Sequence, residues 1–213
     1  EGRAYQRSVV PASGGLWGEH GGGYNRRFRI LIVRKVGVVM QNVRDQREAV
    51  GGGADVVGMV RGMGVRARAA ARGLAGVSGA AKNAALHAMA DLIWERRWGL
   101  MEENAKDVAA AEGEGLAGPL VARLKLPEKK VEAMARGLRE IALQVDPVGQ
   151  TIEAYDRPNG LRIEKRRVPI GVVAIIFESR PNVTADAAGI CLKSGNACIL
   201  RGGKEALHSN KAI

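Results

Sequence analysis

The chain has few aromatic residues and only two cysteines. Trp, Tyr and Phe together make up 4% of its 213 residues, whereas apolar residues as a whole make up 46%. A core built from aliphatic side chains favours helices and buried parallel strands over an aromatic-cored β-sandwich. The two thiols, Cys191 and Cys198, are too few for a disulfide framework, so we expect a reducing, cytoplasmic compartment.

Long apolar runs are also missing. No window of 18 apolar residues exists, so no segment is expected to span a membrane. What the chain has in excess is positive charge, +11 from 33 basic and 22 acidic residues, which raises nucleic-acid binding as an alternative. Because the basic residues are spread along the chain with few aromatics among them, a cavity for phosphorylated ligands explains the charge as well.

The composition changes near residue 60. The first 58 residues hold 12 of the 29 glycines, and one strand-like run, 30–40, is the segment there that could be ordered. We interpret 1–62 as a Gly- and Arg-rich extension, disordered or outside the main fold. Acidic residues in it weaken the alternative of a transit peptide. Met59 and Met63 are candidate starts, since the regular pattern begins just after them.

From Val65 onward, apolar periodicity predicts helices. Ser78 is expected to cap a helix that runs through Trp98, and a second helix covers about 100–111. A third helix begins after Pro127 and is stopped by Pro147. Its apolar stripe consists of Val131, Met134, Leu138, Ile141, Ala142 and Val145.

After residue 160 the period changes to that of strands. The segment 161–168 is predicted to be an edge strand or connecting ribbon, and the apolar run 170–177 a strand buried on both faces. A helix over 183–193, a strand over 197–200 and a helix from Lys204 complete a βαβ unit. The predicted fold class is therefore α/β, with amino-terminal helices followed by the start of a parallel Rossmann-like sheet.

Ligands of open parallel sheets bind beyond the carboxyl ends of the strands. Two segments are predicted at that edge, and both combine cations with turn-forming residues. No G-x-G-x-x-G fingerprint is present, so the residues alone leave two interpretations open, a phosphorylated-nucleotide site and ordinary connecting turns. The residues at the edge are Glu178, Ser179, Arg180, Pro181 and Asn182, followed by Arg201, Gly202, Gly203 and Lys204.

Four sequence elements in this part carry a family resemblance. RVPIGVV, FESRPNVT, LKSGNA and LRGGKEA occur in this order within 166–213. In content and spacing they resemble gamma-glutamyl phosphate reductase, a branch of the aldehyde dehydrogenase superfamily, and the resemblance covers about 63–213. It implies that 63–213 is the incomplete nucleotide-binding domain of an aldehyde-dehydrogenase-type fold.

The resemblance implies an activity in proline biosynthesis. Such an enzyme reduces gamma-glutamyl phosphate with NADPH to glutamate 5-semialdehyde and phosphate, through a thioester on a cysteine. Arg201 would lie near the adenosine ribose, where a guanidinium suits a 2′-phosphate, and Asn182 near the developing oxyanion. The resemblance also implies a homo-oligomer and association with glutamate 5-kinase, and we predict no metal site.

The family's nucleophilic cysteine is expected in a domain beyond Ile213. Cys191 and Cys198 fall in a predicted helix and strand, where free thiols are inert, and His208 is expected on a helix surface. We therefore expect a partial enzyme that is inactive alone. The alternatives are a non-catalytic NADP(H)-binding remnant and a basic nucleic-acid-binding protein.

Overall fold

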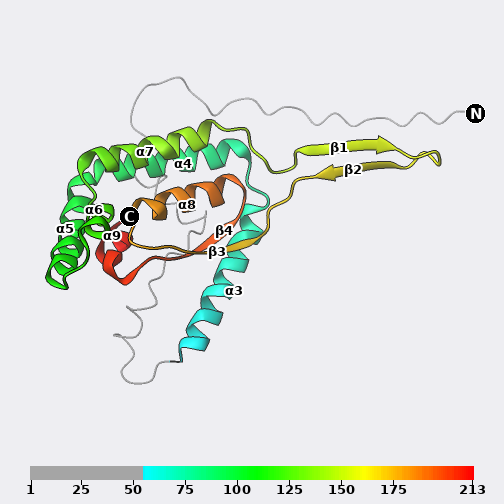
Figure 1. Ribbon diagram of the computed structural model, residues 1–213. Helices are drawn as coiled ribbons and strands as arrows, with labels where there is room; N and C mark the ends of the chain where they lie inside the picture. The colour runs from blue at the N-terminus through cyan, green and yellow to red at the C-terminus, as the bar shows by residue number, and fades with distance from the viewer. Residues whose placement is uncertain (1–54) are drawn as a thin grey trace, which may run out of the picture.

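The computed structural model describes residues 55–213, and the strand predicted over 30–40 lies outside that part of the chain. Helices come first along the described chain, and a hairpin and a βαβ unit follow (Figure 1). The elements are α3 (Val56–Leu74), α4 (Gly79–Glu95), α5 (Arg97–Gly113), α6 (Gly118–Leu124), α7 (Glu128–Leu143), β1 (Thr151–Asp156), β2 (Arg162–Arg166), β3 (Val172–Ile176), α8 (Asn182–Lys193), β4 (Ala197–Arg201), the 3-10 turn η1 (Lys204–Ala206) and α9 (Leu207–Ala212).

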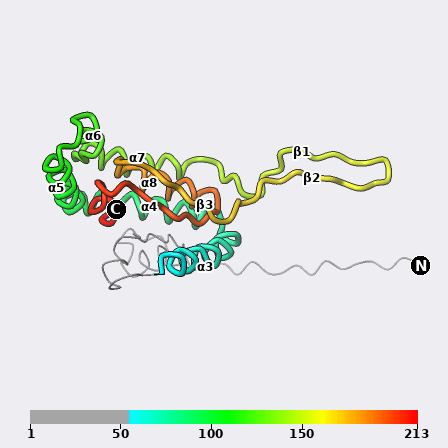
Figure 2. The backbone as a smooth tube through the Cα atoms, turned by 60° about the horizontal axis from the view of Figure 1, so that its bottom comes forward, coloured from blue at the N-terminus to red at the C-terminus, as the bar shows by residue number. Residues whose placement is uncertain are grey.

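The parallel pair β3–β4 lies between helices. Strand β3 pairs with β4 in parallel register, Val172 opposite Ala197 through Ile176 opposite Arg201. On one face, Ala188 and Cys191 of α8 pack against side chains of both strands. On the other, α3 approaches both strands and joins the main core cluster (Figure 2). The predicted α/β class is confirmed.

The main core lies among α4, α7 and α8. Leu86 of α4 and Leu138 of α7 are fully buried, and Leu192 of α8 is 1% exposed. Gly189 of α8 sits where α7 comes closest, because a Cβ there would lie 2.6 Å from the Leu138 Cδ2 atom. The apolar stripe predicted for α7 is confirmed as core through Ala142 but wrong at Val145. Val145 lies beyond the last helical residue, Leu143, and is 79% exposed.

Helix starts agree with the predictions better than helix ends. The Ser78 hydroxyl accepts a hydrogen bond from the Ala81 N–H at 3.2 Å, which confirms the predicted cap. The same helix ends at Glu95 rather than Trp98, because a new helix starts one residue after Arg96. Pro127 is confirmed as the start of α7, whereas the short helix α6 was not predicted.

The helical region also begins earlier than Val65. Helix α3 runs unbroken from Val56 to Leu74, and the Asp55 carboxylate caps it by accepting from the Gly58 N–H at 2.8 Å. The expected boundary between 62 and 63 therefore falls inside a continuous helix. This helix was not predicted from residue 56 because glycines at 58, 62 and 64 disfavour a helix interior.

The expectation that 170–177 is buried on both faces is wrong for part of the run. Ile170 is 83% exposed and Ile176 is 81% exposed, while Val173 and Ile175 pack against α8. Ala174 and Ile176 alternate with Val173 and Ile175, so they lie on the face opposite α8, and both are exposed. Within residues 55–213, β3 also has a single partner strand. The apolar run is thus an edge strand in this part of the chain.

The hairpin β1–β2 projects from the body as a two-stranded arm (Figures 1 and 2). Its strands pair antiparallel, Asp156 opposite Arg162 near the turn and Thr151 opposite Arg166 at the base. Every residue of β1 is exposed, and so is all of β2 except the half-buried Ile163. The extended ribbon predicted over 161–168 is confirmed, whereas β1 was not predicted.

Candidate functional site at the carboxyl edge of the β3–β4 pair

The two predicted site segments meet where β3 and β4 end. The Phe177 N–H, just after β3, donates to the carbonyl of Arg201, the last residue of β4, at 3.0 Å. One turn further on, the Ser179 hydroxyl donates to the Glu205 carboxylate at 2.7 Å. Parallel pairing therefore brings together segments that are more than twenty residues apart in the chain, as the sequence predicts.

Within the first segment, the side chains divide into exposed and buried ones. Glu178 and Arg180 are exposed. Ser179 is 5% exposed and Pro181 is fully buried. Ser179 and Pro181 thus hold the turn in place, and direct contact with a ligand at this segment is open to Glu178 and Arg180.

Asn182 opens α8 and points its amide along the helix. Its Nδ2 donates to the Asp186 carboxylate at 3.0 Å. Burial raises the pKa of Asp186 above its ordinary value, although the Asn182 amide acts in the opposite direction. The amide predicted to support an oxyanion is therefore hydrogen-bonded within its own helix in this structure.

The second segment presents two cations. Arg201 is exposed and donates to the Gly202 carbonyl at 2.8 Å, and it has no carboxylate partner among residues 55–213. The Lys204 ammonium lies 3.4 Å from the Glu114 carboxylate, with both side chains exposed. Arg201 and Arg180 are thus the exposed cations at this edge that have no carboxylate partner among residues 55–213.

Gly202 is needed for packing rather than for turning. A Cβ at this position would collide with the side-chain amide of Asn210 and lie 3.1 Å from the Phe177 ring. The Asn210 amide oxygen in turn accepts from the Thr184 hydroxyl of α8 at 2.9 Å. Gly202 therefore lets α9 pack close to the strand ends, which fixes the direction in which the chain leaves β4.

A buried polar network fixes α9 on α5. The Asp107 carboxylate accepts from the backbone N–H groups of His208 and Ser209 and from the Ser209 hydroxyl, at 3.0, 2.7 and 2.6 Å. Asn104 donates to the Ser209 hydroxyl at 2.9 Å and accepts from the Leu126 N–H at 2.7 Å. Sequence reasoning missed this network, because its partners are about a hundred residues apart and form no motif.

The two cysteines are buried, as expected. Cys191 in α8 is 5% exposed, Cys198 in β4 is 2% exposed, and both are free thiols in one cluster. A hydrogen bond with Cys191, together with burial, raises the pKa of Cys198 far above its ordinary value. His208 lies on α9, half exposed, with its Nδ1 atom 3.6 Å from the Glu103 carboxylate, which confirms its surface position.

Residues 55–213 contain neither a membrane-spanning helix nor a cluster of metal ligands. Between residues 55 and 213, no helix is both long and apolar enough to cross a bilayer. In the same range, no three His, Cys, Asp or Glu side chains gather as ligands of a metal ion.

The fold and its edge define an α/β protein with a parallel strand pair, helices on both faces and cationic turns at the carboxyl ends of the strands. Comparison with known proteins shows which proteins the chain is similar to. The chain is 55% identical over 161 residues to the gamma-glutamyl phosphate reductase of Mesorhizobium japonicum and 57% identical over 148 residues to that of a Thermoanaerobacter species. No protein-family model matches the chain.

Solved structures agree with the sequence relatives. The gamma-glutamyl phosphate reductase of Thermotoga maritima superposes with a TM-score of 0.67 at 42% identity, over 68% of this chain and 35% of that one. The protein of the same name from Saccharomyces cerevisiae gives 0.65 at 37% identity, over 67% of this chain and 36% of that one. The chain is thus homologous to an amino-terminal part of the gamma-glutamyl phosphate reductases.

Each alignment covers a larger share of this chain than of the relative. It takes in 76% of this chain and 38% of the Mesorhizobium protein, and 70% and 36% for the Thermoanaerobacter protein. The chain therefore spans a little over a third of the length of the curated relatives that it matches.

Proposed function

We propose that the chain supplies the nucleotide-binding part of a gamma-glutamyl phosphate reductase of proline biosynthesis. The proposed reaction reduces gamma-glutamyl phosphate to glutamate 5-semialdehyde and phosphate, with NADPH as the reductant. Sequence identity of 55–57% to proteins of that name supports the family assignment. The observation that carries the nucleotide role is the exposed Arg201 at the end of β4, which has no acidic partner in the described chain.

The residues at the edge fit a polyanionic cofactor. Arg180, Arg201 and Lys204 are exposed cations on two turns held together by the Ser179–Glu205 hydrogen bond. A guanidinium pairs with phosphate oxygens through two parallel N–H bonds, so Arg201 is suited to a 2′-phosphate. When bound, NADPH supplies the hydride. This chain's own residues bind and orient the nucleotide, Arg201 by direct pairing and Ser179 by holding the turn.

We propose that neither cysteine of this chain is the nucleophile of the reaction. A nucleophilic thiol needs thiolate character and access to substrate. Cys191 and Cys198 are 5% and 2% exposed, so neither thiol is accessible to substrate. With neither thiol available, the 213-residue chain is expected to bind nucleotide without reducing substrate. The proposal also keeps two parts of the chain, an extension over 1–62 and a nucleotide-binding part over 63–213. The first residues of α3 then belong to the extension.

The compartment and partners are part of the proposal as well. Two buried free thiols are consistent with a reducing, cytoplasmic location. Homo-oligomer formation and association with glutamate 5-kinase are supported only by the family resemblance. Gamma-glutamyl phosphate is the proposed small-molecule substrate of the whole enzyme.

The test is a fluorescence titration of the purified chain with NADPH and with NADH. We expect saturable binding that prefers NADPH and weakens at least about tenfold in Arg201→Ala, as loss of a charge-assisted hydrogen bond predicts. Arg166→Ala, which removes an exposed arginine of the hairpin, is the matched control and is expected to bind as the wild type does. Equal affinity for NADPH and NADH, or equal weakening in both variants, would contradict the role of Arg201.

Binding to duplex DNA tests the alternative of a nucleic-acid-binding protein. Salt-sensitive binding to duplex DNA that NADPH does not compete would favour a basic nucleic-acid-binding protein. Folded protein that binds neither ligand would contradict an independent nucleotide site on this chain.

A further inference from the structure

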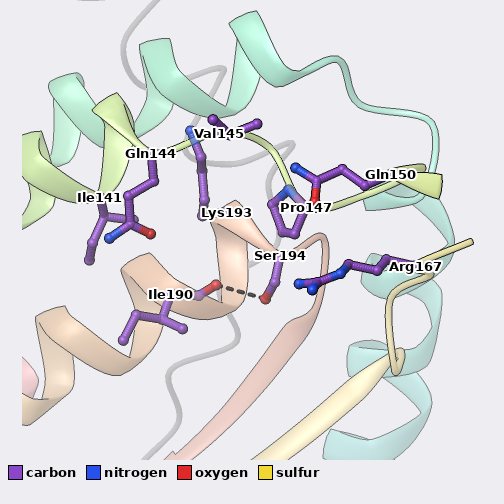
Figure 3. Close-up of a pocket in the computed structure, with 9 residues that line it drawn as sticks. All are labelled: Ile141, Gln144, Val145, Pro147, Gln150, Arg167, Ile190, Lys193 and Ser194. Carbon is purple, nitrogen blue, oxygen red and sulfur yellow. Dashed lines mark hydrogen bonds between the residues drawn. The ribbon is translucent and has the colours of Figure 1, made fainter. Parts of the chain in front are cut away.

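A cavity lies on the side of the molecule where the hairpin joins the body. It has a volume of about 300 Å³ and is bounded by the end of α7, the loop before β1, the residue after β2 and the end of α8 (Figure 3). These elements flank the amino ends of β3 and β4, so the cavity is not part of the carboxyl-edge site. Its size is at the lower end of the range for small-molecule pockets.

The polar side of the cavity is cationic. Arg167 and Lys193 both line it, and Figure 3 shows the Arg167 guanidinium directed toward Ser194. Arg167 is exposed and has no carboxylate partner in the chain from 55 to 213. Lys193 is 4% exposed, and its ammonium donates to the Asn83 amide oxygen and the Ala142 carbonyl at 2.6 and 2.9 Å, which uses two of its three N–H groups.

The Asp146 carboxylate is shared between two lysines. Asp146 lies beside the cavity, but its oxygens are 2.7 Å from the Lys82 ammonium, which is itself 1% exposed. One carboxylate therefore faces the ammonium groups of Lys82 and Lys193, and the Arg167 guanidinium adds a further positive charge at the mouth. The local excess of positive charge is held close to a buried region, where electrostatic interactions are stronger than in bulk water.

The backbone holds Arg167 in place. Its N–H donates to the Gln150 carbonyl at 2.9 Å, and its own carbonyl accepts from the Gly149 N–H at 2.9 Å. Gly149 has a φ of 82°, a conformation that suits glycine, so this reciprocal pair depends on a glycine turn. The Gln150 side chain donates to the Asp146 carbonyl at 2.9 Å, which leaves a second amide N–H for a ligand.

The opposite wall is apolar and open. Ile141, Val145, Pro147 and Ile190 line it, and Val145 and Ile190 are 79% and 59% exposed. A ligand that suits the cavity thus has an oxyanion at one end and a short aliphatic portion at the other. We propose that this cavity is a binding site for a small organic anion, whose carboxylate or phosphate group pairs with Arg167 and whose aliphatic portion lies against the isoleucine, valine and proline side chains.

The test is isothermal titration of the full 213-residue chain with three probes: inorganic phosphate, succinate and glutarate, with chloride salt matched for ionic strength. We expect saturable binding that weakens at least about tenfold in Arg167→Ala, since a charge-assisted pair is lost. Arg166→Ala is the matched control, because its guanidinium pairs with Glu164 on the exposed arm. Arg201→Ala is expected to retain binding, which separates this site from the nucleotide edge.

The three probes distinguish the sources of the oxyanion. Tighter binding of glutarate or succinate than of phosphate identifies a carboxylate ligand and supports a role for the apolar wall, whereas the reverse order identifies a phosphorylated ligand. Equal weakening in Arg166→Ala and Arg167→Ala, or heat that does not saturate, overturns the proposal, because either result indicates general charge screening. A dimer in sedimentation equilibrium that Arg167→Ala dissociates also overturns it, because the cavity is then a contact between copies.

Discussion

The body and the arm of this protein are stabilised in different ways. In the body, Leu86 and Leu138 are fully buried where α4, α7 and α8 pack together. In the arm, β1 and β2 pair from Asp156 to Thr151 with one irregularity at Ile152, yet every β1 side chain is exposed. Backbone hydrogen bonds alone make a two-stranded hairpin only marginally stable in water. The arm therefore depends on its connection to the body, and the hydrogen bonds of Arg167 with Gly149 and Gln150 close the hairpin at that end.

The largest effect is expected from a pair of substitutions that shorten one side chain in the body and one in the arm. Leu138→Ala in α7 is expected to lower the free energy of unfolding by about 3–5 kcal/mol, because it removes buried methyl groups and leaves a cavity. Ile152→Ala in β1, where the side chain is 54% exposed, is expected to change it by no more than about 0.5 kcal/mol. Urea denaturation followed by circular dichroism measures both. A comparable loss in the two variants would mean that the arm is packed in solution.

The second test compares two aspartates. Asp107→Asn replaces an oxygen that accepts two hydrogen bonds from Ser209 by an amide nitrogen that cannot accept them. Leaving buried donors without an acceptor costs roughly 2 kcal/mol. Asp156→Asn, at the exposed end of β1, is the matched control and is expected to leave the melting temperature unchanged. Thermal denaturation distinguishes them, and an unaffected Asp107→Asn variant would show that the network does not stabilise the fold.

A third, smaller effect depends on pH. Burial acts to raise the pKa of Asp146, but the Lys82 ammonium and the Val148 N–H outweigh it and hold the pKa below the ordinary value of 3.8. Because the carboxylate is the form favoured by folding, its contribution is present at neutral pH. It is lost progressively below about pH 5, as pH falls toward and through the folded-state pKa.

The measurement for Asp146 is a series of melting temperatures between pH 7 and pH 3. Asp146→Asn is expected to remove one acid-dependent component of stability relative to the wild type. Glu153→Asn, an exposed acidic residue of the arm, serves as the control and is expected to keep the wild-type profile. Identical pH profiles for the wild type and Asp146→Asn would contradict the importance of the pair with Lys82.

The smallest effect is expected in the arm itself. Glu164 of β2 lies between Arg162 and Arg166, and the two guanidinium groups, Arg166 first, lower its pKa. Exposed ion pairs contribute little because solvent and salt screen them. Glu164→Gln is therefore expected to leave the melting temperature within experimental error in physiological salt. A clear destabilisation that persists in 1 M salt would show that the arm is more protected than its exposure indicates.

The sequence predicts the parts of this fold that depend on local signals. The Ser78 cap, the start of α7 after Pro127 and the change from helix to strand between residues 193 and 197 are set by residues within a few positions of each other. The meeting of the two site segments also follows from the sequence, because parallel strands end at a common edge. The homology to gamma-glutamyl phosphate reductases explains why these motifs occur in one order.

Features that depend on distant partners were not predictable in this way. The exposure of Ile176 depends on what covers the face of β3 opposite α8, and the burial of Lys82 and Lys193 depends on Asp146 and Asn83. From the sequence alone, lysines are expected to be exposed to solvent, because lysine is almost never fully buried without a partner. The cavity at the base of the arm escaped prediction for the same reason, as its cations come from a strand end and a helix end.

The Asn104–Asp107–Ser209 network has a consequence for how the chain is made. Asn104 and Asp107 leave the ribosome about a hundred residues before Ser209, since the pairs are separated by 105 and 102 positions. At typical rates of synthesis this interval lasts about 5–20 s. During it, the Asp107 carboxylate lacks its partners on α9, whereas Asn104 can already pair with Leu126. The attachment of α5 to α9 therefore has to wait until Ser209 has been made.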